Sequence, residues 1–170
     1  MIDKSYVLMM ARYNAWQNNQ IMDFVNVMDE AELLHDHKAF FGSIMGTLNH
    51  LLWGDTLWMS RFCSDVDAPD VPGSQSTTCT ESLGEWQAER FRMDGRMRIW
   101  AQTLSNIDLA GDLVWTYTAT GQDIRQAKAL CVTHMFNHQT HHRGQVHAML
   151  TASGCKKAPT SDLCFMPEDA

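Results

Sequence analysis

The amino-acid sequence predicts an all-α protein: a four-helix bundle of the up-down-down-up type, with a long second connection, a short β-hairpin before the last long helix and a short C-terminal helix. Three observations lead to this prediction. Four long segments carry apolar residues at the helical period. The connection between the second and third of them is rich in proline, glycine and small polar residues. No internal repeat or compositional break divides the chain, so residues 1–170 are predicted to form a single domain.

The first two helices are predicted from the N-terminal third of the chain. The first extends from about Ile2 to Met28, with large apolar side chains at alternating steps of three and four: Tyr6, Met9, Tyr13 and Trp16. Residues 29–41 are predicted to form a loop. Ser43 is a suitable N-cap for the second helix, which continues to about Phe62. This helix is apolar nearly all round, which is typical of a central position in a domain.

The long connection leads into the third helix. Residues 64–77 contain two prolines and several small polar side chains, so we expect a long exposed segment. Thr78 and Glu81 fit a capping box at the start of the helix. The apolar stripe that follows has heptad-like spacing and includes one arginine: Leu83, Trp86, Arg90, Met93, Met97, Trp100 and Leu104.

The C-terminal third contains the predicted hairpin and the last long helix. Residues 113–126 are rich in β-branched and aromatic side chains around a turn at Gly121, which predicts two short strands. The fourth helix spans roughly Ala127 to Ala152 and is closed by Gly154. The segment SDLCFM near the C-terminus predicts one short helix.

Charge and composition argue against several classes of partner. The formal net charge is −7, and the arginines at positions 90–98 are interrupted or preceded by Glu85, Glu89 and Asp94, so no nucleic-acid partner is expected. No apolar run approaches the roughly 20 residues needed to span a bilayer, and the N-terminus lacks a signal-peptide arrangement, so no membrane partner is expected. The five cysteines are widely spaced and include no CxxC pair. This favours reduced thiols and a cytoplasmic location.

The predicted fourth helix contains five of the eight histidines. At about 100° per residue, His138 and His142 lie one turn apart on a face that is otherwise apolar. The other three lie on a flank or on the opposite side: His134, His141 and His147. Leaving a buried imidazole nitrogen unpaired costs roughly 1–3 kcal/mol. Either a metal ion takes a lone pair from each ring of the pair, or both rings make ordinary hydrogen bonds in the core.

A third metal ligand would have to come from another helix, and His50 is the candidate. It lies in the middle of the second helix, and small residues on its side leave room for an ion or a substrate: Gly46, Thr47 and Gly54. His35 and His37 belong to a charged, loop-like segment and are expected to be exposed. Cys131 shares the face of His138 and His142 but lies a full turn or more away, so core packing is the favoured interpretation.

Two motifs carry a resemblance to a known family. LNHLLWGDTLWMSRF contains His50, and HMFNHQTHHRGQVHAML contains His138 and His142. Together they resemble the DinB/YfiT-like family of metalloenzymes, which is unrelated to the DNA polymerase that shares the DinB name. The resemblance covers nearly the whole chain and implies an inward three-histidine site made of these residues. It also implies nickel or zinc as the ion, a homodimer, and a role in the response to damage or stress.

Three nitrogen ligands leave at least one coordination position open, as in catalytic zinc sites. Related enzymes act as S-transferases or maleylpyruvate isomerases with low-molecular-weight thiols. The leading hypothesis is therefore a thiol-dependent S-transferase in detoxification or stress response, with a small-molecule substrate in a pocket at the metal. Two alternatives stay open: a non-catalytic metal-binding dimer, and a hydrolase that uses metal-bound hydroxide.

Four further residues have expected roles at or near this site. His141 is a candidate proton donor or acceptor beside the open coordination position. Asn49 and Gln145 are close enough in sequence to the ligands to orient them, although surface or packing roles fit equally well. Asp55 and Arg90 lie on apolar stripes of the second and third helices, which predicts a buried ion pair; alternatively, one of them orients a ligand histidine or the substrate.

Overall fold

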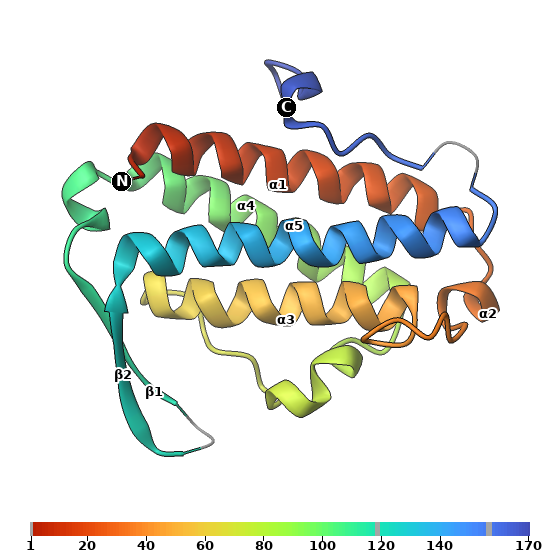
Figure 1. Ribbon diagram of the computed structural model, residues 1–170, viewed down its shortest axis with the longest axis horizontal. Helices are drawn as coiled ribbons and strands as arrows, with labels where there is room; N and C mark the ends of the chain where they lie inside the picture. Colours follow the sequence, from red (N-terminus) through yellow and green to blue (C-terminus); the bar gives the residue numbers. More distant parts are fainter. Residues whose placement is uncertain (1, 118–119, 156–157) are drawn as a thin grey trace.

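The computed structural model describes residues 2–117, 120–155 and 158–170, and within these ranges it is a helical bundle (Figure 1). The long helices are α1 (Lys4–Val25), α3 (Ile44–Phe62), α4 (Leu83–Thr103) and α5 (Lys128–Ala152). In Figure 1, α1 and α5 run in one direction and α3 and α4 in the other, with α5 between α1 and α3. Helix α3 packs against both α5 and α4, and α1 packs against α4. The predicted up-down-down-up bundle is confirmed.

Short elements connect the long helices. They are α2 (Glu30–Leu33), η1 (Gly73–Thr78), η2 (Asn106–Leu109), β1 (Asp112–Tyr117), β2 (Gln122–Ala127) and η3 (Leu163–Phe165). The strands pair antiparallel, with Trp115 opposite Ile124, so the predicted hairpin is confirmed; residues 118–119 of its tip lie outside the described ranges. The short C-terminal helix is a single 3-10 turn, and α2 occupies part of the segment that was expected to be a loop.

Two helix starts test the capping predictions. Ser43 caps α3 as expected, because its side chain accepts a hydrogen bond from the amide of Gly46. The capping box at Thr78 is wrong. Helix α4 begins one turn later, where Ser82 accepts from the amide of Glu85 and the Glu85 carboxylate accepts from the amide of Glu81 at 2.6 Å. The S-x-x-E pattern of residues 82–85 is thus the one that starts the helix.

The connection before α4 is less exposed than its composition suggests. Val66 and Ser76 are both buried, and η1 packs along α3. The indole of Trp53 donates a hydrogen bond to the carbonyl oxygen of Val71 at 2.8 Å, which holds the preceding loop on the same helix. A composition rich in proline and small polar residues predicts that no long helix forms here. It does not predict that the connection packs back against α3.

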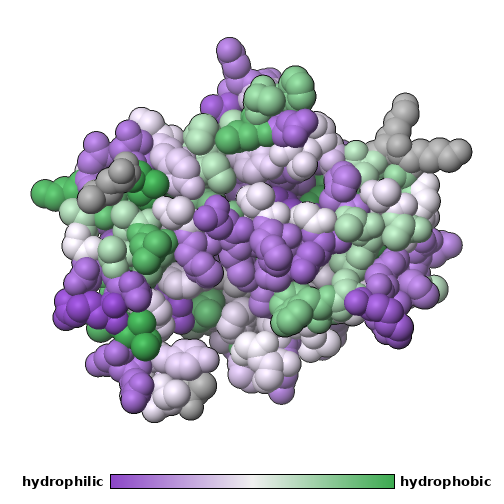
Figure 2. Space-filling model, in the orientation of Figure 1, coloured by the Kyte–Doolittle hydropathy of each residue, from purple (hydrophilic) through white to green (hydrophobic). Residues whose placement is uncertain are grey.

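The core lies between the four long helices and contains large side chains from each of them: Val7, Ile44, Leu48, Met59, Trp86, Met97, Met135, Phe136 and Leu150. The predicted stripe of α4 faces it, and Trp86 donates a hydrogen bond from its indole to the carbonyl oxygen of Leu48 at 3.0 Å. Polar residues form a band across the centre of the face seen in Figure 2, over α5. Among the described helices, none is long and apolar enough to cross a bilayer.

A buried polar network crosses this core and includes side chains from all four long helices: Asn14, Asn18, Asp55, Arg90, Asp94, Gln139 and Arg143. Arg90 is its centre, with Nη1 2.6 Å from the Asp55 carboxylate and Nη2 2.7 Å from that of Asp94. The side chains of Arg90 and Asp55 are 1% and 0% exposed. The predicted buried ion pair between α3 and α4 is confirmed.

Candidate metal centre

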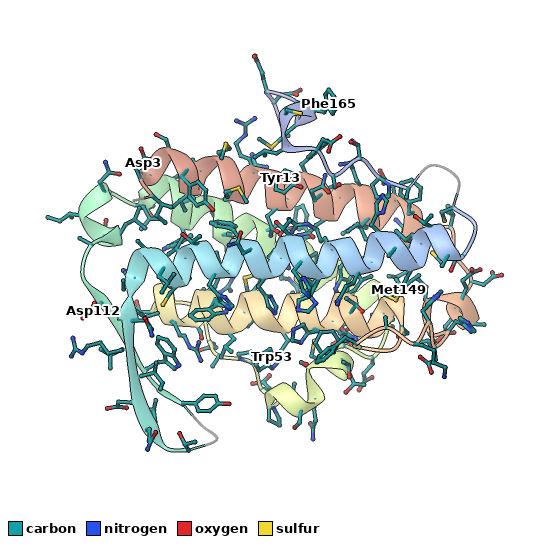
Figure 3. All side chains as sticks on the ribbon, viewed as in Figure 1. Asp3, Tyr13, Trp53, Asp112, Met149 and Phe165 are labelled. Carbon is teal, nitrogen blue, oxygen red and sulfur yellow. The ribbon has the colours of Figure 1, made fainter. Side chains whose placement is uncertain are left out.

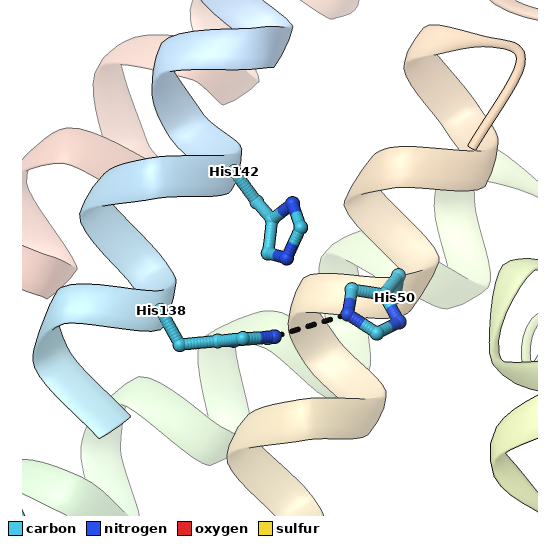
Figure 4. Close-up of side chains that lie close together, drawn as sticks. All are labelled: His50, His138 and His142. Carbon is cyan, nitrogen blue, oxygen red and sulfur yellow. Dashed lines mark hydrogen bonds between the residues drawn. The ribbon is translucent and has the colours of Figure 1, made fainter. Parts of the chain in front are cut away.

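Three histidines meet in the space between α3 and α5. His50 projects from α3, and His138 and His142 project from α5 toward it (Figure 4). One ring nitrogen of each lies within 4.8 Å of the others, and the Nε2 atoms of His50 and His138 are 3.0 Å apart. These are the three histidines that the sequence and the family resemblance indicate together.

The backbone of α3 makes room for one of these rings. A Cβ atom built on Gly54 would lie 2.9 Å from Cε1 and 3.4 Å from Nδ1 of His138. Only glycine lets the ring lie this close to the helix without displacement. On the other side, the ring of Phe41 stacks on His50 with 3.9 Å between centroids and 28° between planes. The two imidazoles are therefore positioned by packing as well as by hydrogen bonds.

Polar groups hold two of the rings through the nitrogen that points away from the cluster. The Nδ1 atom of His142 lies 2.7 Å from Oε1 of Gln145, and an amide oxygen can only accept, so Nδ1 carries the proton. This leaves the Nε2 lone pair of His142 free. The Nδ1 atom of His50 lies 3.0 Å from the hydroxyl of Ser76, which is 2% exposed. Such partners fix the orientation and tautomer of metal-binding histidines.

Burial keeps the cluster neutral. Burial and, to a smaller extent, the neighbouring His142 lower the pKa of His50 to about 4. Burial also lowers the pKa of His138 to about 3, with His142 and His50 adding to the effect. The pKa of His142 is lowered as well, mainly by burial. At neutral pH each ring is an uncharged imidazole, the form that binds a metal ion.

The donor set fits one divalent transition-metal ion. Two nitrogens bound to a tetrahedral zinc ion at about 2.0–2.1 Å lie roughly 3.3 Å from each other, which falls between the separations present in the cluster. The Nε2 atoms of His50 and His138 lie 3.0 Å apart, and two lone pairs that face each other at this distance repel unless a proton or an ion is shared between them. One ion bound by all three rings would satisfy these nitrogens.

The other predicted site residues have different surroundings. His141 is exposed, and its Nε2 atom lies 3.5 Å from the Gln145 amide nitrogen, at the rim of the cluster. Asn49 binds η1 instead of a histidine: it donates to the carbonyl oxygen of Thr77 at 3.0 Å and accepts from the hydroxyl of Thr80 at 2.7 Å. The Asp55 carboxylate contacts Arg90 and Gln139.

The remaining candidates lie outside the cluster. His134 is exposed and its ring packs edge-on against Trp58, with 5.2 Å between centroids. Cys131 is buried in the core, as expected. His35 is exposed, whereas His37 is partly buried, so the expectation of exposure is wrong for His37. All five cysteines are free thiols.

Sequence reasoning missed Ser76, Phe41 and Gln139. Ser76 and Phe41 belong to connections, where no periodicity marks the residue that returns to a helix. Gln139 lies beside His138 on α5 and donates to the carbonyl oxygen of Leu51 at 3.2 Å and to the Asp55 carboxylate. It therefore ties the two helices that carry the histidines together. The one signal for Gln139 in the sequence is that it is a polar residue on the buried side of its helix.

Comparison with known proteins shows which family this chain resembles over nearly its whole length. A family model described as the DinB family matches residues 1–168. Protein DinB of Bacillus subtilis (strain 168) is 24% identical over 152 residues, covering 87% of this chain and 86% of that protein. No solved structure gave a significant match.

Proposed function

The chain belongs to the DinB family, and we propose that it is a metal-dependent enzyme that holds one divalent ion with His50, His138 and His142 and transfers a small thiol to an electrophile. The observation that carries this proposal is the convergence of three uncharged imidazoles on one point between α3 and α5. Nickel and zinc are the proposed ions, because imidazole ligands suit both.

A bound ion would supply Lewis acidity that lowers the pKa of a coordinated thiol or water. The residues of the chain set the conditions for this chemistry. Ser76 and Gln145 hold His50 and His142 in orientation, and Gln139 fixes the spacing of the two helices. His141 is exposed beside Gln145, in a position to exchange protons between the site and solvent.

Access favours a catalytic site. His50 and His138 are only partly buried, so part of each side chain is accessible to solvent. A purely structural zinc site is normally closed by a fourth protein ligand, whereas the group assembled here consists of three histidines. A homodimer, a cytoplasmic location and a role in detoxification or stress response are proposed from the family resemblance alone.

Metal analysis tests the first half of the proposal. Elemental analysis of the purified protein should give about one ion per chain, and the His138→Ala/His142→Ala variant should give none. His147→Ala is the matched control, because it removes a histidine of the same helix that lies outside the cluster. Equal metal content in the wild type and the double variant would show that His138 and His142 do not bind the ion.

Thiol conjugation tests the second half. The metal-loaded protein is mixed with monochlorobimane and each of the common bacterial low-molecular-weight thiols. The proposal expects conjugation that depends on the metal and on His138. A protein that binds one ion but accelerates no conjugation would be a metal-binding protein of another kind. Ester hydrolysis by the loaded protein would then identify a hydrolase.

A further inference from the structure

An arginine and two tryptophans meet where the hairpin contacts the end of α3. The guanidinium of Arg61 lies over the ring of Trp58, 4.6 Å from its centroid, and over that of Trp115, 4.8 Å from its centroid. Trp58 belongs to α3 and Trp115 to β1, and the two rings are 5.7 Å apart. Figure 3, in which Asp112 marks the start of β1, shows the hairpin beside the C-terminal end of α3 and the start of α5. Arg61 thus joins the hairpin to the bundle through two cation–π contacts.

The charge of Arg61 has no anionic partner within the described residues. None of the five ion pairs between these residues includes Arg61, and no hydrogen bond from them satisfies its N–H groups. Burial lowers the pKa of this guanidinium, and among the described groups only the thiol of Cys131 acts in the opposite direction. Arg61 is partly exposed, and none of its nitrogen atoms is buried without a partner, so its N–H donors are accessible to a ligand.

Arg61 lies on the same side of α3 as His50. The two residues are about three helical turns apart, so their Cα atoms are separated by roughly 16 Å along the axis and face one way. The longer Arg61 side chain leans toward the N-terminus of the helix, which brings its guanidinium nearer to the histidines. The ring of His134 lies between the two sites, with its centroid 5.2 Å from that of Trp58 and 5.9 Å from that of His138. A continuous series of rings therefore connects Arg61 with the candidate metal centre.

We propose that Arg61 binds a carboxylate of the small thiol whose sulfur is held at the metal, and so selects thiols of matching length. This inference rests on the proposed function, because it assigns the far end of the same substrate. A guanidinium binds a planar carboxylate through two parallel hydrogen bonds, and the accessible N–H donors of Arg61 are available for them. Trp58 and Trp115 hold the guanidinium in place before the thiol binds, which reduces the entropy lost on binding.

The test uses the full-length protein loaded with cobalt(II), whose absorption spectrum changes when a thiolate binds the ion. 6-Mercaptohexanoate, which is long enough to reach from the ion toward Arg61, is compared with the uncharged 6-mercaptohexanol. We expect the wild type to bind the carboxylate at least tenfold more tightly than the alcohol. Arg61→Gln should bind both thiols equally, and Arg61→Lys should keep part of the preference, because it keeps the charge but not the planar pair.

Two comparisons control this measurement. Arg98→Gln removes an exposed arginine of α4 and should preserve the full preference for the carboxylate. 3-Mercaptopropionate is too short to reach Arg61 from the ion, so its affinity should be the same in the wild type and in Arg61→Gln. Equal affinities of the wild type for 6-mercaptohexanoate and 6-mercaptohexanol would overturn the role of Arg61 and leave the proposed function intact. Failure of every thiol to bind the cobalt ion would instead overturn the proposed function, and with it the thiol as the ligand of Arg61.

A second measurement examines Arg61 without the metal. Hexanoate, which has no thiol, is titrated into the metal-free protein while the indole N–H signals of Trp58 and Trp115 are followed by NMR. We expect saturable shifts of these signals in the wild type and in the His138→Ala/His142→Ala variant, because the carboxylate is not a ligand of the metal. Arg61→Gln should abolish the shifts. Absence of the shifts in the wild type, or their persistence in Arg61→Gln, would overturn the carboxylate site.

Discussion

The ring of His138 fills the space beside α3 that a side chain at Gly54 would need, with Cε1 only 2.9 Å from the position of a Cβ atom. Gly54→Ala should therefore displace this ring while the helix itself persists, since alanine is favoured over glycine in a helix by about 1 kcal/mol. We expect at least tenfold weaker zinc binding, measured by competition with a chelating dye. Gly95→Ala, in α4, should leave the affinity unchanged. Equal affinities for both variants would contradict a role of His138 in binding.

Ser76→Ala removes the hydroxyl that holds Nδ1 of His50. Loss of such a partner typically lowers metal affinity about 10–100-fold. Ser74→Ala is the matched control, because Ser74 is an exposed serine of the same 3-10 helix. The two variants are compared by zinc titration. If Ser76→Ala binds zinc as Ser74→Ala does, the hydrogen bond has no part in orienting the ligand.

The metal-free protein should lose stability as the pH falls from about 6.5 toward 4. Burial lowers the pKa of His50 to about 4 and that of His138 to about 3, whereas a histidine of the unfolded chain titrates near 6.5. Above pH 6.5 neither state is protonated at these rings. Between pH 6.5 and 4 the unfolded state binds protons that the native state does not, so the free energy of unfolding decreases.

Urea unfolding at several pH values measures this dependence. The His50→Asn/His138→Asn variant should show a shallower decrease over the same interval, because the two rings with lowered pKa are gone. A decrease of the same slope in the wild type and the variant would assign the pH dependence to other groups.

Arg90→Met leaves the carboxylates of Asp55 and Asp94 buried without their cation. Breaking a buried pair in this way costs about 3–5 kcal/mol of unfolding free energy. Arg92→Met removes an exposed arginine of the same helix, paired with Glu89, and should cost less than about 1 kcal/mol. Chemical denaturation of both variants checks the difference. Similar losses would show that the buried network contributes little.

The sequence predicts most of the fold because its local signals agree with the packing. Ser43 before an apolar run predicts the start of α3, and the structure has it there. The start of α4 is missed by one turn, because T-x-x-E at residues 78–81 and S-x-x-E at residues 82–85 both fit a capping box. The packing of η1 on α3 decides between them, and this packing involves residues distant in sequence.

In the histidine cluster, too, local sequence signals identify some residues, whereas others depend on packing between distant parts of the chain. His138 and His142 can be found from helical geometry, since both lie on one apolar face. The signal for His50 is weaker, because its helix is apolar nearly all round; its position in mid-helix beside small residues makes it a candidate, and its selection depends more on the family resemblance. The position of Ser76 depends on how a loop packs on α3, so its hydrogen bond to His50 has no signature in the sequence.

His50 and His138 are 88 residues apart in the chain, with α4 and the hairpin between them. Of the three proposed ligands, only His138 and His142 are close enough in sequence to share an ion in an unfolded chain. Full affinity arises when α3 docks on α5, so the proposed ion would bind the native state selectively and stabilise it in proportion to RT ln(1 + [L]/Kd). A cell that runs short of the metal would then lose folded molecules to proteolysis, and the abundance of this protein would follow its metal supply.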